Sequence, residues 1–128
     1  MQASDPDPTQ DAGEQAIETG IALDRNGPTA VLTTYGEFDA LTTPQLRTAI
    51  QQTFEKPPAV LVIDLTRVTF FGSSAIAALV EARQQAGAHT ALRLAVDSYL
   101  DRTLKLIGVE RVFNLFTSVE EALAASAK

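Results

Sequence analysis

The hydrophobic pattern is densest between Ala59 and Val80, where an apolar run is followed by a loop and then by residues at helical spacing. The run from Ala59 to Asp64 is apolar on both faces, which is typical of a strand inside a sheet that helices cover. After a loop over 66–72, a helix is expected to begin at Ser73 or Ser74. Ligands and partners gather at the carboxyl ends of such strands, so the two adjacent serines occupy a candidate site.

Upstream of this unit the pattern predicts a hairpin and a helix. Two β-rich runs, beginning at Ile21 and Thr29, flank the turn signal Asn26-Gly27-Pro28. Thr43 then fits an N-cap with Pro44 at the first helical position, followed by Leu46, Ile50 and Phe54 at a spacing of four. Pro57-Pro58 should end this helix.

Downstream, Gly87 is the expected stop of the helix that starts at the serines, with Ile76, Leu79 and Val80 inward. A strand over 91–96 would complete a right-handed parallel crossover. Ser98 with Asp101, and later Ser118 with Glu121, resemble capping boxes of two further helices, with an extended segment over 112–116 between them. The pattern therefore predicts an α/β fold, in which a mixed β-sheet with a parallel centre is packed by about four α-helices.

Composition narrows the class of protein. The 128 residues are enough for one domain, and the chain has no cysteine, which excludes disulfides and thiolate chemistry. Five of the 16 acidic residues, and none of the 10 basic ones, lie within residues 1–20, so residues 21–128 are close to neutral. We expect residues 1–20 to be a disordered acidic tail and residues 21–128 to be the domain. A cytoplasmic protein that binds neither nucleic acid nor membrane is the expectation.

Known catalytic templates fit poorly. Ser74 stands where a G-x-S-x-G elbow has its nucleophile, but Ile76 replaces the second glycine. The single histidine, His89, should lie about 18 Å away beyond a helix of about a dozen residues. Glu37 and Asp39 are two carboxylates, too few for a metal site. No phosphate-binding glycine loop occurs, so we expect no enzyme, cofactor or metal.

Two interpretations of the serines remain on local chemistry. A helix N-terminus favours added phosphate, because its N–H groups lack partners and the helix dipole is positive there. The structural alternative is that one serine is only an N-cap, which would contribute about 1 kcal/mol.

Two motifs add a family resemblance. Gly36-Glu37-Phe38-Asp39 stands before the first helix, and the run from Asp64 to Ala75, DLTRVTFFGSSA, spans the strand-helix junction. In order and spacing they resemble the G-E-[LIF]-D and D-L-[ST]-x-V-x-F-x-D-S-[ST]-G motifs of the STAS domain, in particular of bacterial anti-sigma factor antagonists. The resemblance covers about Ile21 to Leu123.

This resemblance implies a phosphoprotein that regulates transcription by partner switching in a bacterial stress response. The unphosphorylated protein would bind an anti-sigma factor that is a serine kinase and so release the sigma factor. Phosphorylation, by resemblance at Ser73, with Ser74 as the alternative, would end the binding until a serine phosphatase resets the protein. The implied partner-binding residues are Asp39, Gly72, Ser73, Ser74 and Ala75.

The chain departs from the motif at two positions. Gly72 replaces the motif's Asp, and Ala75 replaces its Gly. The competing hypothesis is a STAS interaction scaffold or ligand-sensing module that is not phosphorylated.

Overall fold

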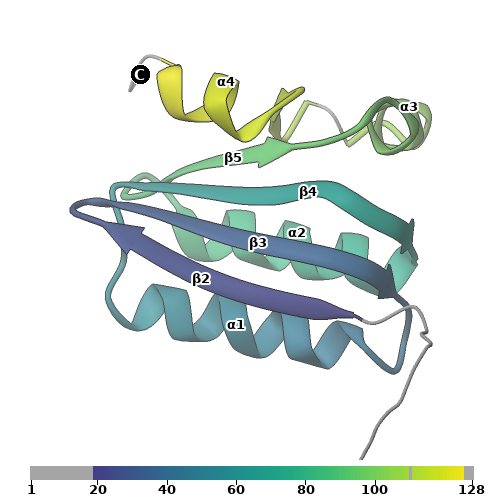
Figure 1. Cartoon of the computed structure of the whole chain (residues 1–128), viewed down its shortest axis with the longest axis horizontal. Coiled ribbons are helices and arrows are strands. Elements are labelled where there is room, and N and C mark those ends of the chain that lie inside the picture. The colour runs from purple at the N-terminus through teal and green to yellow at the C-terminus, as the bar shows by residue number, and fades with distance from the viewer. Residues whose placement is uncertain (1–18, 110, 126–128) are drawn as a thin grey trace, which may run out of the picture.

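One five-stranded sheet organises the chain. The computed structural model describes residues 19–109 and 111–125 (Figure 1). The strands are β2 (Gly20–Asn26), β3 (Thr29–Phe38), β4 (Val60–Phe71), β5 (Ala91–Ala95) and β6 (Asn114–Phe116). They lie in this order across the sheet; β2 is antiparallel to β3, and the other neighbours are parallel. The predicted mixed sheet with a parallel centre is confirmed.

The helices lie on both sides of this sheet. They are α1 (Thr43–Glu55), α2 (Ser73–Ala86), α3 (Ser98–Leu106) and α4 (Val119–Ala124). Figure 1 shows α1 and α2 side by side under one face, α4 above the other face, and α3 beyond the end of β5. None of the helices in residues 19–109 and 111–125 is long and apolar enough to cross a membrane.

The core between α1, α2 and the sheet depends on small residues. The buried face of α2 consists of Leu79 and four alanines (Ala75, Ala78, Ala82 and Ala86). Ile76 and Val80, which the sequence placed inward, are only partly buried at the edge of the core. Alanines let α2 approach α1 closely, and an ion pair crosses the gap, with Arg47 Nε 2.8 Å from Glu81 Oε1.

The strand that leads to the serines is longer than expected. β4 continues through the predicted loop to Phe71, because its second half pairs with the end of β3, where Phe38 is opposite Phe71. Two irregularities in the register, after Thr33 and after Gly36, permit this extended pairing. The expectation of a loop over 66–72 was therefore wrong.

Two predicted helix starts were displaced by one residue. Thr42, not Thr43, is the N-cap of α1. Asp97, not Ser98, caps α3, and its side chain accepts a hydrogen bond from Leu100 N. The cap at Ser118 is confirmed, since its Oγ accepts from Glu121 N at 3.0 Å. The expected disordered tail falls almost wholly on residues 1–18, outside the described part of the chain.

Candidate functional site

Ser73 lies at the carboxyl edge of the sheet, where β4 ends and α2 begins. Gly72 is extended and is the N-cap of α2, with a backbone carbonyl that accepts from Ile76 N at 3.0 Å. Its own N–H donates to the carbonyl oxygen of Phe38 at 3.0 Å. This bond fixes the start of α2 to the end of β3, so both sequence motifs meet at one edge.

The two serine hydroxyls have different environments. Ser73 is exposed, whereas Ser74 is half-buried and its Oγ lies 3.1 Å from Oγ1 of Thr43. Thr43 is fully buried as the first residue of α1. The prediction that one serine is the N-cap was wrong, because β4 runs directly to Phe71 and leaves Gly72 in the cap position.

The first turn of α2 can stabilise an anion beside Ser73. The N–H groups of a helix's first turn have no partner within the helix, and the dipole adds positive potential there. Gly72 contributes no side-chain hydrogen bond to them. A phosphate on Ser73 would therefore lie next to backbone donors that no capping side chain occupies.

Asp39 organises the turn between β3 and α1. Its Oδ1 accepts hydrogen bonds from Leu41 N at 2.9 Å and Thr42 N at 3.0 Å, and lies 3.1 Å from Thr42 Oγ1. These bonds, foremost the one from the Thr42 backbone, lower the pKa of the Asp39 carboxyl below its ordinary value. Asp39 therefore stabilises the turn that leads into α1. This turn positions Thr43, the first residue of α1, against Ser74.

Two exposed apolar side chains lie on the segments that meet at the site, and neither was predicted from the sequence. Leu41, in the β3–α1 turn, is 86% exposed, and Phe70, near the end of β4, is 47% exposed. A Cβ added to Gly72 would lie 3.1 Å from the Phe70 ring, so the ring is adjacent to the start of α2. Successive strand residues face opposite sides, so a strand prediction extended through Phe71 would have placed the two rings on opposite faces.

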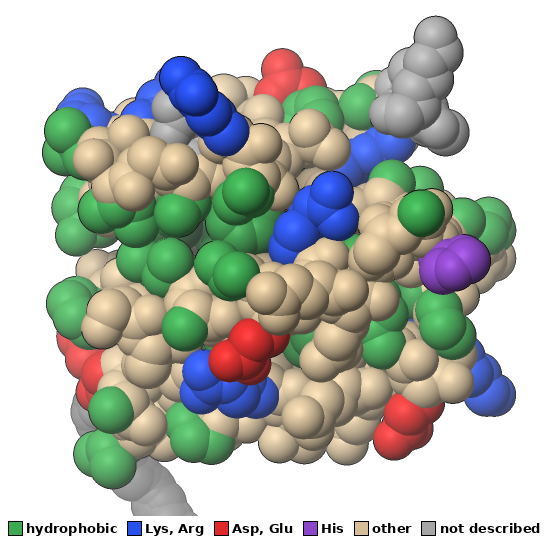
Figure 2. All heavy atoms as spheres, turned by 180° about the vertical axis from the view of Figure 1, so that it is seen from behind, with side chains coloured by type: hydrophobic (Ala, Val, Ile, Leu, Met, Phe, Trp, Pro, Cys, Tyr) green, Lys and Arg blue, Asp and Glu red, His purple; other side chains and the backbone are tan. Residues whose placement is uncertain are grey.

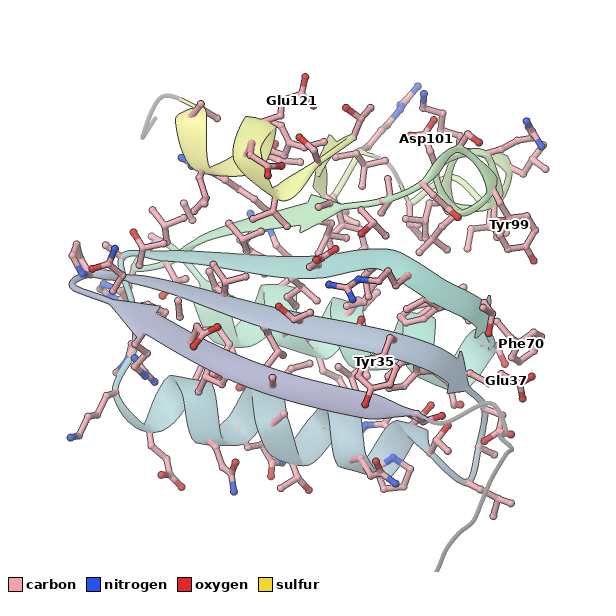
Figure 3. All side chains as sticks on the ribbon, viewed as in Figure 1. Tyr35, Glu37, Phe70, Tyr99, Asp101 and Glu121 are labelled. Carbon is pink, nitrogen blue, oxygen red and sulfur yellow. The ribbon has the colours of Figure 1, made fainter. Side chains whose placement is uncertain are left out.

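Figure 3 shows Phe70 and Glu37 at the same end of the sheet, where they project outward from the strand ends. They are register partners on β4 and β3. We call the surface formed by Leu41, Phe70, Gly72 and Ser73 the Ser73 rim. Ala75 lies beneath it, fully buried in the core, so its side chain is not on the rim.

The positions of the described residues add no support for a catalytic or metal site. His89 is exposed in the turn between α2 and β5, at the opposite end of α2 from Ser73. Within the described residues no group of three or more His, Cys, Asp or Glu side chains could hold a metal ion. In the described part of the chain, Glu37 and Asp39 therefore gain no third such side chain that would complete a metal site.

Comparison with known proteins agrees with this fold. The STAS domain family model matches residues 20–122. An anti-sigma-F factor antagonist, RsfB of Mycobacterium tuberculosis, is 35% identical over 106 residues, which are 82% of this chain and 86% of RsfB. The chain therefore belongs to the STAS domain family.

Two solved structures illustrate the fold. An anti-sigma factor antagonist from Mycobacterium paratuberculosis superposes with a TM-score of 0.81 at 27% identity, covering 87% of this chain and 96% of that one. Bacillus SpoIIAA in its phosphorylated form gives a TM-score of 0.63 at 17% identity, covering 81% of this chain and 96% of that one. At that identity SpoIIAA supports the shared fold alone.

Proposed function

We propose that this protein is an anti-sigma factor antagonist that binds an anti-sigma factor through the Ser73 rim and loses that binding when Ser73 is phosphorylated. The relatives named as antagonists support the antagonist function in the first half of the proposal, and the choice of the rim as the binding surface rests on its exposed apolar side chains. The second half rests on one observation: Ser73 is exposed at the start of α2, whereas the hydroxyl of Ser74 is paired with that of Thr43.

The rim has the surface chemistry that such a partner requires. Exposed apolar side chains concentrate binding energy at protein interfaces, and two are available here: Phe70, next to the start of α2, and Leu41, in the turn between β3 and α1. A phosphate on that hydroxyl would add nearly two negative charges and three strongly hydrated oxygens. The unmodified rim can be buried against a partner, but the phosphorylated rim would have to be desolvated at a large cost.

The switch leaves the fold in place. The phosphate would project from an exposed position and be stabilised locally by the first turn of α2, while the core beneath, including Ala75, is unchanged. In this account the protein is the substrate of a kinase, which is the anti-sigma factor itself, and of a phosphatase that restores the hydroxyl. It works as a regulatory protein in the cytoplasm.

Phosphate transfer tests the site. The full chain would be incubated with the anti-sigma factor of its own cell and ATP, and the phosphate located by fragment mass spectrometry. We expect one phosphate, on Ser73, and none on a Ser73→Ala variant. Phosphate on Ser74 or Thr69 would contradict the assignment. A partner that binds tightly without any transfer would favour the scaffold hypothesis instead.

A further inference from the structure

A hollow of about 720 Å³ lies between α3, α4 and β6, and none of its lining residues belongs to the Ser73 rim. Its floor is apolar and is made by buried or half-buried side chains (Val96, Phe113, Leu115 and Phe116). It lies beyond the carboxyl ends of β5 and β6, where parallel sheets commonly bind ligands. Its volume is within the range of known ligand sites.

The edge of this hollow is acidic. Three carboxylates line it, from Asp97, Asp101 and Glu121, against one ammonium group, from Lys105. Figure 3 labels Asp101 on α3 and Glu121 on α4, both on the upper side of the molecule. The surplus of negative charge makes a cation the favoured occupant and disfavours an anion.

Each carboxylate retains one oxygen for a ligand. Asp97 Oδ1 accepts from Leu100 N, and Asp101 Oδ2 is 3.0 Å from Lys105 Nζ. Glu121 Oε1 accepts from the backbone N–H of Thr117 at 2.8 Å. The second oxygen of each group makes no hydrogen bond within the described residues. The bonds that are made hold the three carboxylates in place and leave these oxygens available.

We propose that the hollow binds an arginine side chain of a protein partner. Arginine combines an apolar stem, which suits the floor, with a planar guanidinium that makes paired hydrogen bonds to carboxylates. We assign the arginine to a polypeptide, because an exposed apolar side chain adjoins the lining in the chain: Val112 precedes the floor residue Phe113 and is 48% exposed.

A peptide titration tests the charge and the source of the ligand. The full chain, labelled with ¹⁵N, would be titrated with a capped Leu-Arg-Leu peptide, with its citrulline analogue, and with free arginine amide. The arginine peptide should shift the amide signals of Asp101, Thr117 and Glu121. Its affinity should exceed that of either other probe by about threefold or more. Equal binding of the citrulline peptide, equal binding of arginine amide, or shifts at the Ser73 rim would overturn the proposal.

Two charge variants should change the affinity for the arginine peptide in opposite directions, and a third is their control. Glu121→Gln should weaken the arginine peptide about threefold, whereas Lys105→Gln, which removes the competing ammonium, should strengthen it by a similar factor. Glu120→Gln is the matched control, since it makes the same charge change on the same helix outside the lining of the hollow. Weaker binding by Lys105→Gln would overturn the proposal even if Glu121→Gln were unstable. None of these variants touches Ser73, so the outcome is independent of the proposed switch.

Discussion

The hydroxyl oxygens of Thr43 and Ser74 are 3.1 Å apart, so the first residue of α1 is joined to the second residue of α2. The contact fixes two helix starts against each other at the edge where Ser73 is exposed. It also distinguishes two neighbouring serines that are chemically identical in the sequence.

A double-mutant cycle should detect this contact. Thr43→Val and Ser74→Ala should each lower the free energy of unfolding by about 1 kcal/mol, because each leaves a hydroxyl partner unsatisfied in a partly buried site. The double variant should lose less than the sum of the two. Urea denaturation measures all four proteins. Strict additivity would show that the two hydroxyls do not interact.

Ser73→Glu should weaken binding to the anti-sigma factor by about tenfold or more, because a fixed charge enters an interface suited to a neutral hydroxyl. Ser73→Gln is the matched control, similar in size but neutral, and should bind more tightly than Ser73→Glu. Calorimetry gives both affinities. If the two variants were equally weak, size rather than charge would explain the loss.

Gly72→Asp should be tolerated and should raise the free energy of unfolding by a few tenths of a kcal/mol, since Asp is a better N-cap than Gly. The backbone at Gly72 has a φ of −82°, which any residue adopts. The new Cβ would require only a small shift of the exposed Phe70 ring, 3.1 Å away. Thermal unfolding measures the change, with Gly72→Ala as the control that adds a Cβ without a cap. A large destabilisation by both variants would mean that the ring cannot move.

The pKa of Asp39 predicts a pH dependence. Because hydrogen bonds from Thr42 and Leu41 lower this pKa in the folded state, the ionised carboxylate stabilises the fold above its unfolded pKa. That contribution is lost as the pH falls through the lower, folded pKa. Asp39→Asn should therefore reduce the loss of stability on acidification, whereas Asp24→Asn, at an exposed position on β2, should not. Equal acid sensitivity of Asp39→Asn and the parent protein would contradict this role.

Local signals in the sequence predicted much of the fold. The hairpin turn, the stop of α2 at Gly87 and the cap at Ser118 depend on residues that act within a few positions of each other. The length of β4 was missed, because its last residues are held by pairing with β3 rather than by their own pattern. Pairing between residues far apart in the chain does not produce a recognisable pattern in the sequence of either strand.

At the site, too, local features could be predicted from the sequence and long-range contacts could not. The serines could be placed at the start of a helix from spacing alone, but their separate roles could not. The Thr43–Ser74 contact joins residues 31 positions apart and exists only because α1 and α2 pack side by side (Figure 1). The ion pair between Arg47 of α1 and Glu81 of α2 also joins residues that are 34 positions apart. Figure 2 shows basic and acidic side chains next to each other on this surface of the molecule.

Affinity before and after phosphate removal tests the central claim most directly. Protein phosphorylated on Ser73 would be titrated into the anti-sigma factor by calorimetry, and the same preparation titrated again after a phosphatase has removed the phosphate. The account predicts weak or undetectable binding in the first titration and full affinity in the second. Equal affinity in both titrations would contradict it.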